Sequence, residues 1–86
     1  MYQINPKILK TPIADGKILL LEPQQGLYFE LNEVSVVIFE CISNGMNHVE
    51  ILSKLLDVFD VDKHNAESDL LEMVQQFMDN NIILEA

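Results

Sequence analysis

The sequence contains no arginine and no tryptophan, and only one cysteine among its 86 residues. A single cysteine excludes an internal disulfide framework. Cys41 lies inside an apolar run, which favours a small buried hydrophobic residue over a nucleophile or a redox thiol. No apolar stretch approaches the length of a membrane span, and no basic segment precedes an apolar one at the amino terminus. We therefore expect a cytoplasmic protein without a signal peptide.

Positive charge is also scarce. Fourteen carboxylates face five lysines, which gives a formal net charge of -9. From Met1 to Phe29 there are three lysines and two acids, whereas Glu30 to Ala86 contains twelve acids and two lysines. Such a surface repels nucleic-acid phosphates and anionic lipids. The composition predicts no nucleic-acid partner and no membrane partner, and any polar partner is expected to be cationic.

The first third of the chain predicts three short strands. Asp15-Gly16 separates KILKTPI from KILLLE, and PQQG separates KILLLE from LYFEL. An Asp-Gly pair between apolar runs is a hairpin signal, and Gly26 supplies the unusual backbone angle with which a longer loop re-enters a strand. Pro12 cannot donate a ladder hydrogen bond, so it places the first strand at an edge or a bulge.

Three helices are predicted for the remainder. Asn32 reads as the N-cap of a buried helix that ends at Asn44-Gly45. Asn47 and Glu50 form a capping-box pair for an amphipathic second helix. A third helix is expected from about 65 to 80, before an apolar tail, IILE, that adds a last extended segment. With no repeat and no linker, residues 1–86 predict a single α+β domain of winged-helix-like layout, a three-stranded antiparallel sheet followed by three helices.

The third helix is apolar over an unusually wide arc. At about 100° per residue, one stripe suits a core helix, and three further apolar residues widen the arc to about 160°. The stripe comprises Ala66, Leu70, Met73 and Phe77, and the widening residues are Leu71, Val74 and Met78. We expect this surplus apolar flank to contact a partner, or alternatively to pack against the tail IILE or a second copy of the domain.

Chemistry-bearing residues are few. His48 lies near a helix start and His64 in a polar loop, with no clustered metal-ligand set. Three scattered glycines do not make a phosphate-binding loop, and no serine occupies a strand-to-helix elbow. The carboxylates are spread along exposed helix faces. We expect no enzymatic activity, no cofactor and no metal.

The strand LYFEL carries neither proline nor lysine to blunt an edge. A bare edge offers unpaired backbone groups to another chain, and soluble proteins usually cover it. We therefore predict that a peptide pairs with this strand, beside the third helix. The predicted peptide-binding residues are Leu27, Tyr28, Phe29, Glu30, Leu31, Glu67, Leu71, Val74, Gln75 and Met78. On this prediction, Leu71→Asp or Met78→Asp abolishes peptide binding and leaves the helical signal intact.

The chain resembles the PqqD family, the small leader-peptide-binding proteins also called RiPP recognition elements. The resemblance rests on ILLLE, on a Gly-x-Tyr-x-x-Leu-Asn segment, on the buried helix that ends at Gly45, on VEIL, and on a D-x-L-x-x-x-x-x-F-x-x-x-x-x-I pattern. The Gly-x-Tyr segment is Gly26, Tyr28, Leu31 and Asn32, and the last pattern is Asp69, Leu71, Phe77 and Ile83. Val34 and Ser35 replace the small or threonine residues frequent in the family, and the third helix lacks the basic residues of many relatives.

This resemblance implies a non-catalytic adaptor. It would bind the leader of a ribosomally made precursor as a strand added to the third strand, and present the precursor to a protease, a cyclase or a radical SAM enzyme. The Gly-x-Tyr segment is more similar to stand-alone members of lasso-peptide clusters than to the quinone-cofactor member. Three alternatives stay open: a PQQ-biosynthesis peptide chaperone working with a radical SAM enzyme, a winged-helix DNA-binding regulator, and a homodimer with paired edges.

Overall fold

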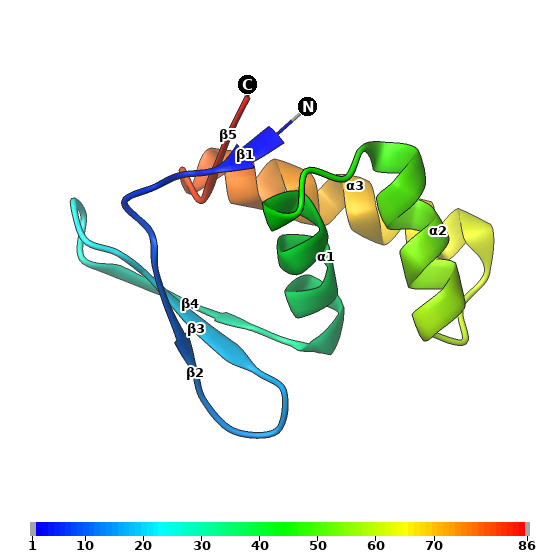
Figure 1. Ribbon diagram of the computed structural model, residues 1–86, viewed down its shortest axis with the longest axis horizontal. Helices are drawn as coiled ribbons and strands as arrows, with labels where there is room; N and C mark the ends of the chain where they lie inside the picture. Colours follow the sequence, from blue (N-terminus) through cyan, green and yellow to red (C-terminus); the bar gives the residue numbers. More distant parts are fainter. Residues whose placement is uncertain (1, 86) are drawn as a thin grey trace.

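The computed structural model describes residues 2–85, which form five strands and three helices (Figure 1). One antiparallel sheet has the order β2 (Leu9–Pro12), β3 (Ile18–Glu22), β4 (Leu27–Leu31), and a separate two-stranded ladder joins β1 (Tyr2–Ile4) to β5 (Ile83–Glu85). The helices are α1 (Glu33–Ser43), α2 (His48–Val58) and α3 (Lys63–Asp79). The predicted α+β layout, with a three-stranded antiparallel sheet followed by three helices, is confirmed.

The turns of the sheet follow the sequence signals. Asp15 and Gly16 both have positive φ, 55° and 75°, as a tight hairpin turn between β2 and β3 requires. Gly26 re-enters β4 with φ 69°, and the register then pairs Glu22 with Leu27. Pro12 ends β2, which is an edge strand as its proline predicts.

Polar side chains cap all three helices. The Asn32 Oδ1 accepts the Ser35 backbone N–H at 2.9 Å at the start of α1. Asn47 and Glu50 form the predicted reciprocal capping box of α2, with both hydrogen bonds at 2.9 Å. The third helix begins at Lys63, two residues earlier than expected, because the Asp62 carboxylate accepts an N–H of its first turn at 2.8 Å.

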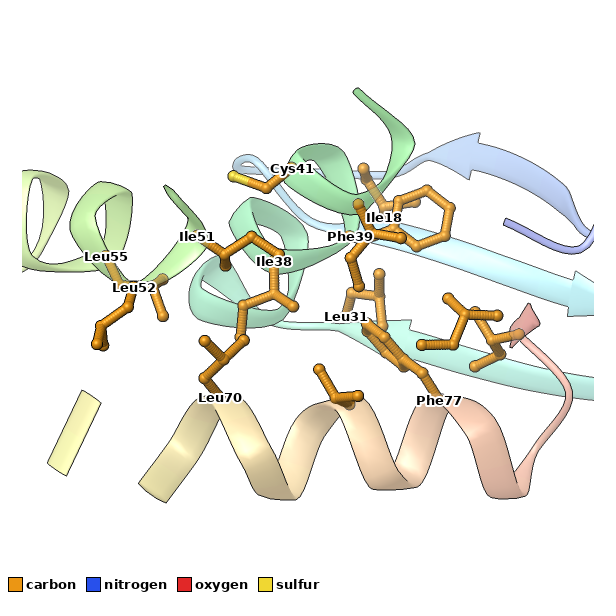
Figure 2. Packing of buried hydrophobic residues seen from close by; sticks show 14 of the residues in the cluster. Ile18, Leu31, Ile38, Phe39, Cys41, Ile51, Leu52, Leu55, Leu70 and Phe77 are labelled. Carbon is orange, nitrogen blue, oxygen red and sulfur yellow. The ribbon is translucent and has the colours of Figure 1, made fainter. Parts of the chain in front are cut away.

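A continuous apolar core lies between the sheet and the helices (Figure 2). Leu70 and Phe77 point from α3 towards α1 and β4, and the Phe77 ring packs edge-on against Phe39 with centroids 6.3 Å apart. The central helix α1 buries Ile38 fully, as its predicted all-round apolarity requires. The thiol of Cys41 is buried in the same cluster, and burial raises its pKa, which matches the predicted structural role.

The two faces of the sheet differ. Along β3, Ile18 and Leu20 face the core. On the opposite face the register aligns Leu9, Leu21 and Tyr28 across the three strands, and Leu9 and Tyr28 are exposed. No helix among the described residues is both long and apolar enough to span a bilayer.

The ladder between β1 and β5 was only half predicted. The tail IILE forms β5 as expected, but the sequence did not indicate β1, its partner. The buried Asn5 reinforces the pairing: its backbone N–H donates to the Ile82 carbonyl at 2.9 Å and its side-chain amide to the Asn81 carbonyl at 2.8 Å. Ile82 and Ile83 are thereby fixed in the core.

Candidate functional site

Strand β4 is paired on one side only. Its ladder partner is β3, and the other edge of β4 has no strand partner among residues 2–85. The carboxy-terminal tail, which could have covered this edge, pairs with β1 instead. In an antiparallel strand, alternate residues direct their N–H and C=O groups to opposite sides, so the outer edge of β4 presents backbone donors and acceptors to another chain.

A groove runs between this free edge and α3. Its volume is about 400 Å³. Its lining residues come from β4, the start of α1, α3 and the tail: Tyr28, Phe29, Glu30, Leu31, Asn32, Ser35, Met73, Gln76, Phe77, Asn80 and Ile82. The floor is apolar, because Leu31, Phe77 and Ile82 are core residues. Gln76 and Asn80 add amide groups that can bond an extended backbone.

Four of the five residues predicted on β4 lie along the groove. Tyr28, Phe29, Glu30 and Leu31 all line the groove. Leu27 is exposed but lies outside the lining. The carboxylate of Glu30 forms an exposed ion pair with Lys17 at 3.5 Å, so a peptide at this position would meet a partly neutralised charge.

The residues that the sequence predicted on α3 lie away from this groove. Leu71 is 56% exposed and lines a different hollow with Glu67. Val74 is buried in the core, so it belongs to the core-facing stripe of α3, in which the sequence analysis had placed Met73. Gln75 is exposed and bonds Asp79 along the helix, and Met78 packs against the core. None of these five predicted residues lines the groove.

Met73, Gln76, Phe77 and Asn80 take their place. Their spacing of three, four and seven residues puts them on one helix face. At about 100° per residue, Leu71 lies about 160° around the helix from Met73. In the sequence, the side-chain amides of Gln76 and Asn80 were the signal that could have identified this face. A helix face that binds the polar backbone of a peptide need not be wholly apolar.

The arrangement can bind an extended peptide. Among residues 2–85, no three His, Cys, Asp or Glu side chains are close enough together to hold a metal ion. His64 is exposed and His48 half-buried, and neither lines the groove. An extended peptide would find backbone hydrogen-bonding groups on the β4 side and apolar and amide side chains on the α3 side.

A sequence profile of the family described as coenzyme PQQ synthesis protein D, PqqD, matches residues 17–83. The chain belongs to the PqqD family. No curated protein matches it significantly.

Two solved structures share the fold of this PqqD-family chain. TbiB1 in complex with the TbiA(beta) leader peptide aligns with a TM-score of 0.88 and 24% identity, over 98% of this chain and 96% of that chain. Lasso peptide synthetase B1 complexed with the leader peptide aligns with a TM-score of 0.87 and 23% identity, over 98% of each. At these identities the likeness establishes the fold.

Proposed function

We propose that this PqqD-family chain is a non-catalytic adaptor, one domain that binds the leader segment of a ribosomally synthesised precursor peptide and presents it to a modifying enzyme or a leader protease. The leader adds as a strand to the free edge of β4 and occupies the groove beside α3. The observation that carries the proposal is the unpaired β4 edge with a groove of about 400 Å³ alongside it. Two structures of the same fold are described as leader-peptide complexes, which supports this use of the fold.

The expected affinity follows from the parts of the groove. About four ladder hydrogen bonds contribute a net ~1 kcal/mol each. Two buried side-chain anchors contribute ~1.5–3 kcal/mol each. Ordering the peptide costs ~2–5 kcal/mol. The balance of about 2–8 kcal/mol reaches roughly micromolar binding at its favourable end, where both anchors are fully buried and the cost of ordering the peptide is smallest.

Titration calorimetry with a candidate precursor peptide tests the proposal. We expect roughly micromolar binding of its leader and no binding of the isolated core peptide. ¹⁵N-resolved NMR should show the largest shifts at β4 and at Met73, Gln76 and Asn80. Binding whose shifts lie on α2, or the absence of binding, would refute the proposal.

Two classes of partner enzyme are compatible with such an adaptor. One of the two similar structures is described as a lasso peptide synthetase B1, which favours a leader protease or cyclase. The family description names coenzyme PQQ synthesis, which favours the alternative of a peptide chaperone for a radical SAM enzyme. Reconstitution with each class of enzyme separates them: only the true partner should process the precursor faster when the adaptor is added.

Charge opposes the DNA-binding alternative. The exposed surface of α3 carries Glu72, Gln75 and Gln76 with no arginine, and the chain has a net charge of -9. A recognition helix needs basic residues for phosphates. We expect no electrophoretic shift of duplex DNA even at low salt.

A further inference from the structure

The groove beside β4 does not end with the strand. A second hollow, of about 250 Å³, shares Asn32 and Met73 with it and adds Val34, Asp69 and Glu72. A third, of about 70 Å³, shares Val34 and Asp69 with the second. The three hollows therefore follow one another along α3, from Asn80 towards Ala66.

The series is longer than the strand that opens it. The five residues of β4 offer about 17 Å of ladder. The stretch of α3 from Ala66 to Asn80 spans about 21 Å, and the second and third hollows lie past the last β4 residue, at the start of α1 and beside α2. When a peptide pairs with all of β4, its next residues therefore reach the second and third hollows.

The chemistry changes along the series. The groove beside β4 presents the amides of Gln76 and Asn80. The second hollow carries two exposed carboxylates, Asp69 and Glu72, and the ion pairs of residues 2–85 include neither of them. No lysine or histidine lines either of the further hollows.

The third hollow is apolar apart from its rim. Its lining is Val34, Leu55, Phe59, Val61 and Ala66, with Asp69 at the boundary to the second hollow. Its volume, about 70 Å³, is the smallest of the three and accommodates a small aliphatic side chain. The apolar hollow and the two carboxylates are separate observations that point to the same ligand segment.

We infer that recognition extends beyond the added strand: the peptide segment next to it carries a lysine or arginine for Asp69 and Glu72, and a small aliphatic residue for the hollow beside Phe59. This inference rests on the proposed function, because the same bound peptide enters through the β4 groove. An added strand that continues the antiparallel order of the sheet, slightly the more stable pairing, runs opposite to β4. The segment concerned is then the one on the amino-terminal side of the added strand.

Selection from a phage-displayed library of random dodecapeptides on the full chain tests the inference. We expect enriched sequences in which alternating apolar residues follow, at a fixed distance, a small aliphatic residue and a lysine or arginine. Repeating the selection on the Asp69→Asn, Glu72→Gln double variant should remove the basic preference and keep the apolar one. Val61→Phe, which fills the third hollow, should remove the aliphatic preference instead.

The affinity of one selected peptide for each protein variant tests the inference quantitatively. The double variant should bind about five- to twenty-fold more weakly, since each exposed ion pair contributes a few-fold. A version of the peptide with its basic residue replaced by alanine should bind both proteins equally. Asp79→Asn is the matched control: it removes an α3 carboxylate outside the three hollows, and its effect should be below two-fold.

The outcomes distinguish a failure of this inference from a failure of the proposed function. Selected peptides that need Met73 but show no basic or aliphatic preference would overturn this inference and leave the proposed function standing. If no peptide is enriched, or if binding is indifferent to Met73→Asp, the proposed function falls and the inference with it.

Discussion

The two edges of the same three-stranded sheet are built in opposite ways. The edge strand β2 carries Pro12 and Lys10, and Lys10 is held by Glu40 of α1 at 2.9 Å. The edge strand β4 carries neither proline nor lysine, and an open groove runs alongside it. Proline and lysine are the usual means of preventing strand pairing. The contrast is what the proposed strand addition requires, because only the bare edge leaves its backbone groups free to pair with a peptide.

The largest expected effect is at the α3 wall of the bare edge. Met73→Asp removes an apolar contact and places a carboxylate against an incoming peptide, so we expect a loss of about 2 kcal/mol, or about thirty-fold in leader affinity. Calorimetry measures it. Leu71→Asp is the matched control on the opposite face of the helix and should change affinity less than two-fold. A stronger effect at Leu71 than at Met73 would restore the face that the helical pattern alone suggested.

The turn that opens β4 is expected to matter for stability. Glu22 is buried, and its carboxylate accepts the backbone N–H groups of Gln24 at 3.3 Å and Gln25 at 2.7 Å. Glu22→Leu leaves both donors without this partner, and we expect a loss of about 1–3 kcal/mol in the free energy of unfolding. Urea denaturation measures it. Glu40→Leu removes an exposed carboxylate and should cost under 1 kcal/mol.

A smaller effect is expected at Tyr28. Its side chain is exposed on the outer face of the sheet, beside Leu21. An added strand would place one of its side chains next to this ring, and such cross-strand pairs contribute ~0.2–1 kcal/mol. Tyr28→Ala should therefore weaken leader binding by up to about five-fold in a fluorescence titration. Leu9→Ala, on the same face but at the far edge, should leave affinity unchanged.

The smallest effect on peptide affinity is expected from exposing the protected edge. In a Lys10→Thr, Pro12→Val double variant, β2 loses both of its blunting residues and becomes a second bare strand. Sedimentation should show self-association that rises with protein concentration, while leader affinity stays within two-fold. If the variant remains monomeric at all concentrations, proline and lysine are not what distinguishes the two edges.

Local signals predicted most of the fold. The Asp15-Gly16 turn, the caps at Asn32 and Asn47, and the open strand at 27–31 each depend on residues close together in sequence. Strand β1, which the sequence did not predict, depends on a segment far away in the sequence, because Tyr2–Ile4 pairs as a strand with Ile83–Glu85. Three residues with no turn signal before them carry no local pattern to detect.

The face of α3 could not be assigned from its periodicity. An apolar arc of about 160° contains two overlapping stripes, and both Met73 and Val74 fit a helix that packs on a core. Packing decides between them: Val74 and Phe77 are buried in the core, whereas Met73 is only partly buried and lines the groove beside β4. The predicted residues therefore share β4 and α3 with the groove of the structure and differ from it in the face of α3, and which residues bind a peptide stays a prediction.

The hydrogen bonds of Asn5 have a consequence for binding equilibria. They fasten Asn81 and Ile82 directly before β5, and β5 itself pairs with β1, so in this structure the apolar tail does not occupy the β4 edge as an internal competitor. When a segment of the same protein occupies the binding edge, only the fraction of molecules that has released it can bind a ligand. The apparent affinity is then reduced by that fraction. If the ladder stays closed in solution, the dissociation constant measured for a ligand should equal its intrinsic value, and association should follow a single kinetic phase without a preceding opening step.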